Sequence, residues 1–143
     1  DFNLLNQYGA SVGWKSYKGK IFVLNLFHAS NRTFGVDFAN KAMGGLTEVY
    51  AKNTMLQFMS VSINPVEDQP SVLRRYADQI SANKEKWDLL TGDSTQIYQL
   101  VNTGLFLDAL KTIKNGENKF IYNNMFVLID SKHRIRRVEN PNN

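Results

Sequence analysis

The residues with the most chemical potential lie in one short polar loop near the start of the chain. An apolar run typical of a buried strand, Ile21–Phe27, ends at this loop, which contributes His28, Arg32 and Thr33 before a segment with helical spacing begins. At the amino end of a helix, these side chains could bind an anion together with free backbone N–H groups, and His28 could also bind a metal. The structural alternatives are a solvated arginine and a histidine that only ends a strand.

The composition excludes several kinds of chemistry. The 143 residues include no cysteine, so the chain can form no disulfide, no thiolate metal site and no thiol nucleophile. A hydrophobic content of 43% indicates a globular protein, and the length fits a single domain spanning residues 1–143. A net charge of +4, with the charges scattered, gives no reason to expect nucleic acid as a partner. No stretch reaches the ~20 apolar residues of a membrane span, and the first residues do not resemble a signal peptide.

Apolar periodicity predicts alternating strands and helices that would position this loop. A glycine pair, Gly44-Gly45, predicts a bend or a close contact within the first helix, and Asp68 or Gln69 would cap the second. Such an order is typical of a mixed-sheet α/β domain, and a thioredoxin-like fold fits because its sheet ends in an antiparallel hairpin. The expected elements are an amino-terminal β-hairpin (Phe2–Gln7 and Ser11–Trp14), strands Ile21–Phe27, Met55–Ile63, Trp87–Leu90, Phe126–Ile129 and Arg134–Val138, and helices over Phe34–Lys52, from Pro70 to Ile80, after Ser94 and over Leu105–Ile113.

Three further groups of side chains could carry chemistry, but each has a structural interpretation that we favour. Methionine can ligate copper, yet the spacing of the methionines indicates core packing. Asp68 and Asp130 could be paired acids, but they lie at a predicted helix start and strand end. The basic run Lys132–Arg137 could bind phosphate, although lysine and arginine also protect an edge strand from association. The four methionines are Met43, Met55, Met59 and Met125.

Four segments, in order, resemble the Sco/SenC family of thioredoxin-like copper chaperones associated with cytochrome oxidase assembly. The resemblance covers almost the whole chain. The segments are Lys18-Gly19-Lys20-Ile21 with the strand that follows, Ser60–Asp68 (SVSINPVED), Leu73–Ala77 with Trp87–Gly92 (WDLLTG), and Phe126–Asp130 (FVLID) with Ile135-Arg136.

The resemblance also implies which residues have replaced the family's ligands. The two cysteines of the family's CxxxC motif align with Asn31 and Gly35, and its histidine aligns with Tyr122. The aspartate of its SVDP motif aligns with Asn64. Because Cu(I) prefers thiolate, thioether or imidazole ligands, we expect no copper and no other cofactor in this chain.

Three functional hypotheses follow. The first is a non-catalytic Sco/SenC-like domain that binds a protein partner. The second is a divergent oxidoreductase or electron-transport protein that works with a thiol-bearing partner. The third is an anion or small-molecule binder at the Asn31–Gly35 loop, with Arg32, Thr33 and His28 as contacts. The resemblance further implies an extracytoplasmic location, with any membrane anchor preceding Asp1.

Overall fold

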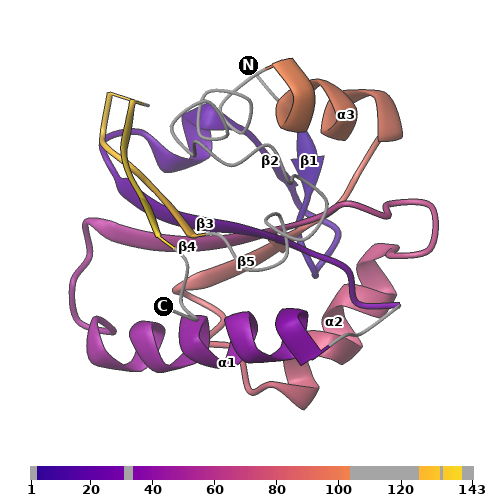
Figure 1. The fold of residues 1–143 in the computed structure, drawn as a ribbon, viewed down its shortest axis with the longest axis horizontal. Coiled ribbons are helices and arrows are strands. Elements are labelled where there is room, and N and C mark those ends of the chain that lie inside the picture. The colour runs from indigo at the N-terminus through magenta and orange to yellow at the C-terminus, as the bar shows by residue number, and fades with distance from the viewer. Residues whose placement is uncertain (1–2, 31–33, 104–125, 133, 140–143) are drawn as a thin grey trace.

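The computed structural model describes residues 3–30, 34–103, 126–132 and 134–139. Within these ranges, a five-stranded sheet is covered on both faces (Figure 1). The strand order is β5-β4-β3-β6-β7, with β3, β4 and β5 parallel and β6 and β7 antiparallel to their neighbours. This confirms the expected thioredoxin-like arrangement of a mixed sheet that ends in a hairpin. The elements are β1 (Leu4–Leu5), β2 (Ser11–Val12), the 3₁₀ helix η1 (Trp14–Tyr17), β3 (Ile21–Phe27), α1 (Phe34–Val49), β4 (Leu56–Ser62), α2 (Pro70–Gln79), β5 (Trp87–Leu90), α3 (Ser94–Thr103), β6 (Phe126–Ile129) and β7 (Ile135–Glu139).

Each face of the sheet has its own apolar core. The helices α1 and α2 cover one face, while the amino-terminal hairpin, η1 and α3 lie on the other (Figure 1). Because β3 and β4 are buried on both faces, their sequences are nearly continuous apolar runs. The α1–α2 side is built on Phe27, Met43, Phe58, Leu73, Tyr76, Trp87 and Leu89, and the opposite side on Leu4, Tyr17, Phe22, Leu24, Leu26, Met59, Leu90 and Ile97.

The methionine predictions are confirmed for two residues and wrong for one. Met43 and Met59 are fully buried in the core, as expected. Met55 precedes β4 instead of lying in it, and its side chain is 53% exposed. Its backbone N–H binds the side-chain oxygen of Asn53 at 3.0 Å, so the residue belongs to a turn. Met125 lies outside the described residues.

The predicted amino-terminal hairpin forms, but both of its strands, Leu4–Leu5 and Ser11–Val12, are shorter than predicted. Trp14 was expected in the second strand, but it begins η1, whose turn is closed by a hydrogen bond from the Gly13 N–H to the Ser16 hydroxyl at 3.1 Å. The Trp14 ring stacks on Phe22 with centroids 5.7 Å apart. Trp14, which suggested a strand in the sequence, therefore packs against one of the two apolar cores.

The edge strand β5 is covered by the segment that follows β1. Leu5 and Thr91 exchange two backbone hydrogen bonds of 2.7 and 2.8 Å. The Gln7 side chain then donates to the Trp87 carbonyl at 3.1 Å and accepts from the Leu89 N–H at 3.0 Å, as a neighbouring strand would. A polar side chain thereby satisfies backbone groups that an exposed edge would leave unpaired.

Gly92 allows close packing beside β1, whereas the glycine pair in α1 is not required by its surroundings. A Cβ at Gly92 would lie 2.9 Å from Leu4 Cδ2, so the chain can approach β1 only without a side chain there. The helix α1 continues through Gly44-Gly45, where a Cβ on Gly44 would lie 3.7 Å from the Trp87 ring. That is an ordinary van der Waals distance, and a Cβ on Gly45 would meet no atom within 4 Å, so the close contact predicted for this pair is not found.

The remaining helix predictions are tested in part. The helix expected after Ser94 is present as α3, and the Asp93 carboxylate caps it by accepting from the Gln96 N–H at 3.3 Å. The helix predicted over Leu105–Ile113 lies outside the described residues. No helix in the described ranges is long and apolar enough to span a membrane.

Candidate functional site

The candidate site lies where β3 ends and the chain turns toward α1. His28, Ala29 and Ser30 follow β3 directly, and α1 begins at Phe34. Pairing between β3 and β4 continues to this point, because the Ile63 N–H donates to the Phe27 carbonyl at 2.9 Å. The carboxyl ends of two parallel strands thus border the loop, as in other open α/β folds that place ligands here.

One buried carboxylate holds the loop in place. Asp68 is fully buried, and its two oxygens accept from the backbone N–H groups of Ala29 and Ser30, each at 2.9 Å. The Ser62 hydroxyl donates to the same carboxylate at 2.6 Å. Three donors on one buried charge form a strong anchor, since hydrogen bonds to ionised groups are the more stabilising kind.

This position corrects the predicted role of Asp68. It was expected as a candidate cap of α2, but Gln69 is the cap residue, and its side chain makes no capping hydrogen bond. The Asp68 carboxylate instead joins the β4–α2 loop to the chain that follows β3. Sequence reasoning missed this contact because its partners are backbone groups 38 and 39 residues away.

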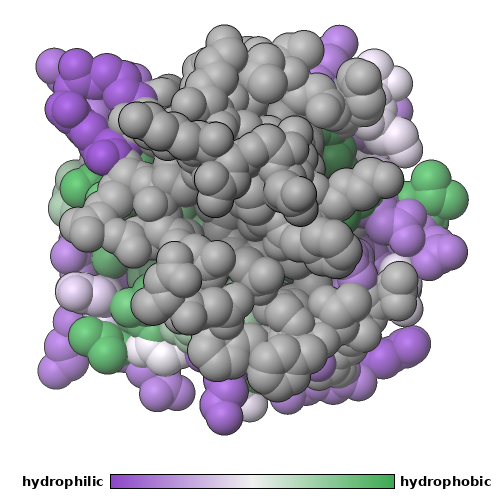
Figure 2. Space-filling view, in the orientation of Figure 1, coloured by the Kyte–Doolittle hydropathy of each residue, from purple (hydrophilic) through white to green (hydrophobic). Residues whose placement is uncertain are grey.

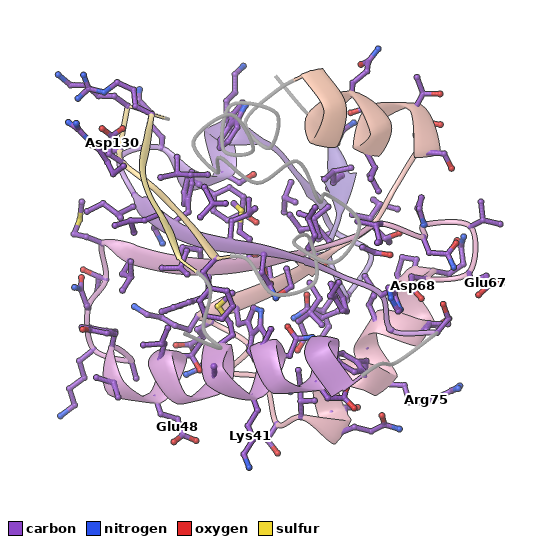
Figure 3. All side chains as sticks on the ribbon, viewed as in Figure 1. Lys41, Glu48, Glu67, Asp68, Arg75 and Asp130 are labelled. Atoms are coloured by element: carbon purple, nitrogen blue, oxygen red, sulfur yellow. The ribbon has the colours of Figure 1, made fainter. Side chains whose placement is uncertain are left out.

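The second aspartate singled out in the sequence lies at the other end of the sheet (Figure 3). Asp130 accepts from the backbone N–H groups of Lys132 and Arg134 and from the Nε atoms of Arg134 and Arg136, at 2.8 to 3.0 Å. The Arg134 N–H first, then the Lys132 N–H and the Arg134 side chain, lower its pKa to about 2. Asp68 and Asp130 therefore do not form an acid pair. Asp130 follows β6 directly, as the sequence favoured, whereas Asp68 anchors the chain after β3 instead of capping α2.

A buried polar network lies beneath the loop and fixes α1 on the sheet. The Asn25 amide donates to the Asn40 side-chain oxygen at 3.0 Å, and Asn40 donates to the Tyr76 hydroxyl at 2.8 Å. On the other side, the Ser60 hydroxyl donates to Asn25 and accepts from the Trp87 indole at 2.9 Å. All five side chains are buried. Because amides and alcohols neither gain nor lose protons near neutral pH, this network orients helices and strands and does not supply an acid or base.

The described part of the chain contains two of the six predicted site positions. His28 is 9% exposed, and its Nδ1 is buried with no hydrogen-bond partner among the described residues. Gly35 lies in the first turn of α1. The other four positions, Asn31, Arg32, Thr33 and Tyr122, lie outside the described residues, so their convergence stays a prediction. Among the described residues, no three histidine, aspartate or glutamate side chains are grouped as a metal site would require.

A second acid within the fold, the partly buried Asp88, was missed in the sequence. Tyr17 donates to the Asp88 carboxylate at 2.6 Å, and Gln57 donates to it at 3.4 Å. Burial raises the pKa of Asp88, although the Tyr17 hydrogen bond and the charge of Lys20 oppose the shift. Burial and the neighbouring carboxylate also raise the pKa of Tyr17. The available signal was an acid within an apolar strand, which requires a partner.

Comparison with known proteins agrees with the architecture. The family model described as SCO1/SenC matches residues 1–143. The SCO1 protein homolog of Bacillus subtilis strain 168 is 24% identical over 128 residues, which cover 90% of this chain and 66% of that protein. A SCO1/SenC family lipoprotein from Bacillus anthracis superposes with a TM-score of 0.75 at 25% identity, over 97% of this chain and 82% of that one. BsSco, a member of the Sco family of cytochrome c oxidase assembly proteins, superposes with a TM-score of 0.73 at 20% identity, over 97% and 80%. This chain belongs to the SCO1/SenC family.

Proposed function

We propose that this chain is a non-catalytic SCO1/SenC domain, with residues 1–143 forming one domain that acts by binding a protein partner. The observation that carries the proposal is the retained family scaffold in a chain of 143 residues without cysteine. Thiol–disulfide exchange needs a thiolate, and Cu(I) needs soft ligands. Asn31, Gly35 and Tyr122, at the aligned ligand positions, offer an amide, no side chain and a phenol.

The process and location are proposed from the relatives. BsSco belongs to a family of cytochrome c oxidase assembly proteins, and the Bacillus anthracis relative is a lipoprotein. We therefore place the proposed partner binding in cytochrome oxidase assembly or electron transport, outside the cytoplasm and near a membrane.

A Cu(I) competition experiment tests the central claim. The chain is titrated against a coloured Cu(I) chelator under anaerobic, reducing conditions, with a cysteine-containing relative as the positive control. We expect the chelator to retain all the copper in the presence of this chain. A complex that withdraws Cu(I) from the chelator would contradict the proposal.

An anion or small-molecule site at the Asn31–Gly35 loop is a second candidate, favoured by one observation. His28 is nine-tenths buried, and its Nδ1 has no hydrogen-bond partner among the described residues. A buried polar atom of this kind normally has a protein, water or ligand partner. It lies just before the 16-residue helix α1, whose amino terminus favours negative charge.

Thermal shifts with a panel of small anions test this site. We expect phosphate, sulfate or a small carboxylate to raise the melting temperature of the wild type. The shift should disappear in Arg32→Ala and shrink in His28→Phe, while Lys41→Ala serves as a control on the exposed face of α1. Unchanged shifts in Arg32→Ala would exclude the loop as the site.

A further inference from the structure

The end of the sheet opposite the candidate site brings several distant chain segments together. The Ile21 N–H donates to the Met55 carbonyl at 2.8 Å, so the starts of β3 and β4 adjoin there. The pairing of Phe22 with Ile129 places the β6–β7 turn at the same end. The carboxyl end of α1 also lies on this side, at the left of Figure 1. We call this region the amino-end surface.

Exposed apolar side chains gather on the amino-end surface. Four of the eight large apolar side chains exposed in the described ranges belong to it: Ile21 at 38%, Val49 at 74%, Tyr50 at 44% and Met55 at 53%. They come from β3, the end of α1 and the turn before β4. Green, hydrophobic residues accordingly alternate with purple ones along the left margin of Figure 2. Single exposed apolar residues are normal, but a group of them beside charges indicates an interaction site.

The charges beside this apolar group are mainly basic. Arg134 and Arg136 are 56% and 57% exposed, and both use their Nε atoms to bind Asp130, at 3.0 and 2.8 Å. The terminal amino groups of both arginines remain as further hydrogen-bond donors beside the Asp130 carboxylate, which already has its partners. Lys132 in the same turn is exposed, as are Lys18 and Lys52. The surface is therefore suited to a partner of negative charge.

A hollow of about 160 Å³ opens on the same surface. Lys20, Lys86, Leu56, Gln57 and Glu85 contribute to its lining, so two basic residues and one acidic residue border it. Lys86 is buried, and its ammonium group donates to the Asn53 carbonyl. Burial, followed by repulsion from Lys20, lowers the pKa of Lys86. A second carboxylate entering the hollow would reduce this repulsion.

We infer that the amino-end surface is a docking site for an acidic segment of a partner protein. A glutamate or aspartate side chain of the partner enters the hollow between Lys20 and Lys86, while its apolar neighbours pack on Tyr50 and Met55. Interface cores are enriched in tyrosine, methionine and arginine, all of which are present here. A concave, charged hollow fits a protruding side chain better than the plane of a bilayer. The inference rests on the proposed partner-binding role and assigns it to a surface at the other end of the sheet from the candidate site. The copper titration and the test below can therefore fail independently.

Nuclear magnetic resonance with the ¹⁵N-labelled chain tests the inference. The probe is a short synthetic peptide of glutamate, leucine and serine, with a lysine-for-glutamate peptide as its control. We expect the acidic peptide alone to shift amide signals of Lys20, Met55 and Lys86. Its affinity should fall at least about tenfold in Lys20→Glu/Met55→Ser, a loss of about 1.4 kcal/mol, and should also fall with added salt.

Two further variants separate specific docking from general effects. Lys132→Ser/Arg134→Ser should weaken binding without touching the hollow. Ile63→Ser/Val66→Ser removes exposed apolar groups at the opposite end of the sheet and should leave the affinity unchanged. The inference is overturned if the acidic peptide does not bind, or if the variants at both ends weaken it equally. Retention of the chain by phosphatidylglycerol vesicles without any peptide binding would also overturn it, in favour of a membrane contact.

Discussion

The two ends of the sheet stabilise the same fold in different ways. At the carboxyl end, the Asp68 carboxylate is fully buried and all of its contacts hold other parts of the chain in position. At the amino end, the acid in the β6–β7 turn is bound by exposed arginines, and basic and apolar side chains face solvent. The difference indicates that the carboxyl end retains the internal support of a site, whereas the amino end presents groups that a partner can reach.

The largest expected effect comes from restoring the family ligands at the carboxyl end. Asn31→Cys/Gly35→Cys/Tyr122→His should bind Cu(I) orders of magnitude more tightly than the wild type, because it supplies two thiolates and an imidazole. The chelator competition described above measures this change. Asn31→Ser/Gly35→Ser/Tyr122→Phe is the matched control, and it should bind no Cu(I). A triple cysteine–histidine variant that folds but binds no Cu(I) would show that this end no longer holds the family geometry.

Removing the anchor of the loop should have the next largest effect. Asp68→Asn keeps the shape of the side chain but places an amide N–H group opposite one of three donors, and we expect a loss of about 2–4 kcal/mol in the free energy of unfolding. Urea denaturation measures the loss, and hydrogen exchange should accelerate at Ala29 and Ser30. Glu67→Gln, on the neighbouring exposed residue, should change stability by less than about 0.5 kcal/mol. Equal effects of the two variants would remove the contrast between a buried anchor and a surface acid.

The Tyr17–Asp88 pair should make the free energy of unfolding depend on pH in the alkaline range. Because the pKa of Tyr17 is raised in the folded state, the unfolded chain releases this proton first, above the ordinary value of 10.0. The stability conferred by the neutral phenol is therefore complete below pH 10 and is lost as the pH rises further. Each pH unit above 10 should cost the wild type about 1.4 kcal/mol more than Tyr17→Phe.

The same variant should also be less stable at neutral pH. Without the phenol, the partly buried Asp88 carboxylate loses its shorter hydrogen bond, at a cost of about 1–3 kcal/mol. Urea midpoints at neutral and alkaline pH test both statements, with Tyr50→Phe as an exposed control. Parallel pH profiles for the wild type and Tyr17→Phe would contradict the assignment.

The smallest effect is expected at Asp130. Its pKa is lowered to about 2, so its contribution to stability is complete above the ordinary value of 3.8 and is lost as the pH falls toward 2. Asp130→Asn should therefore be slightly less stable than the wild type at neutral pH, and the difference should vanish only below pH 2. The carboxyl carbon signal of Asp130 provides a direct measurement, with a midpoint expected near 2. A midpoint near 4 would mean that the arginine contacts do not persist in solution.

Local pattern predicted most of the fold because the strands and helices differ in period. The buried strands β3 and β4 were recognisable from their apolar residues, and the hairpin of β6 and β7 from the polar turn between its strands. Trp14 and Met55 were wrongly predicted to lie in strands, because an aromatic or apolar residue next to a strand extends its apolar pattern. Hydrogen bonds with Ser16 and Asn53 instead give these two segments a turn conformation.

The support of the candidate site was much less predictable. Asp68 binds backbone groups, which leave no pattern in the sequence, and Tyr17 meets Asp88 across 71 residues. Sequence identifies such residues as acids, but only the fold shows what they bind. The ligand positions themselves came from family resemblance, and no local physical signal distinguishes Asn31 or Tyr122 from other polar residues.

The hydrogen bonds of Gln7 have a consequence for how the sheet can grow. Its amide occupies the backbone groups of Trp87 and Leu89 at one margin, where another copy of the chain could otherwise add a strand. The Gln7 side chain thus prevents another chain from pairing with β5 and extending the sheet. A chain that keeps its core but loses this amide would remain folded as a monomer at low concentration and would begin to assemble into strand-paired oligomers as the concentration rises.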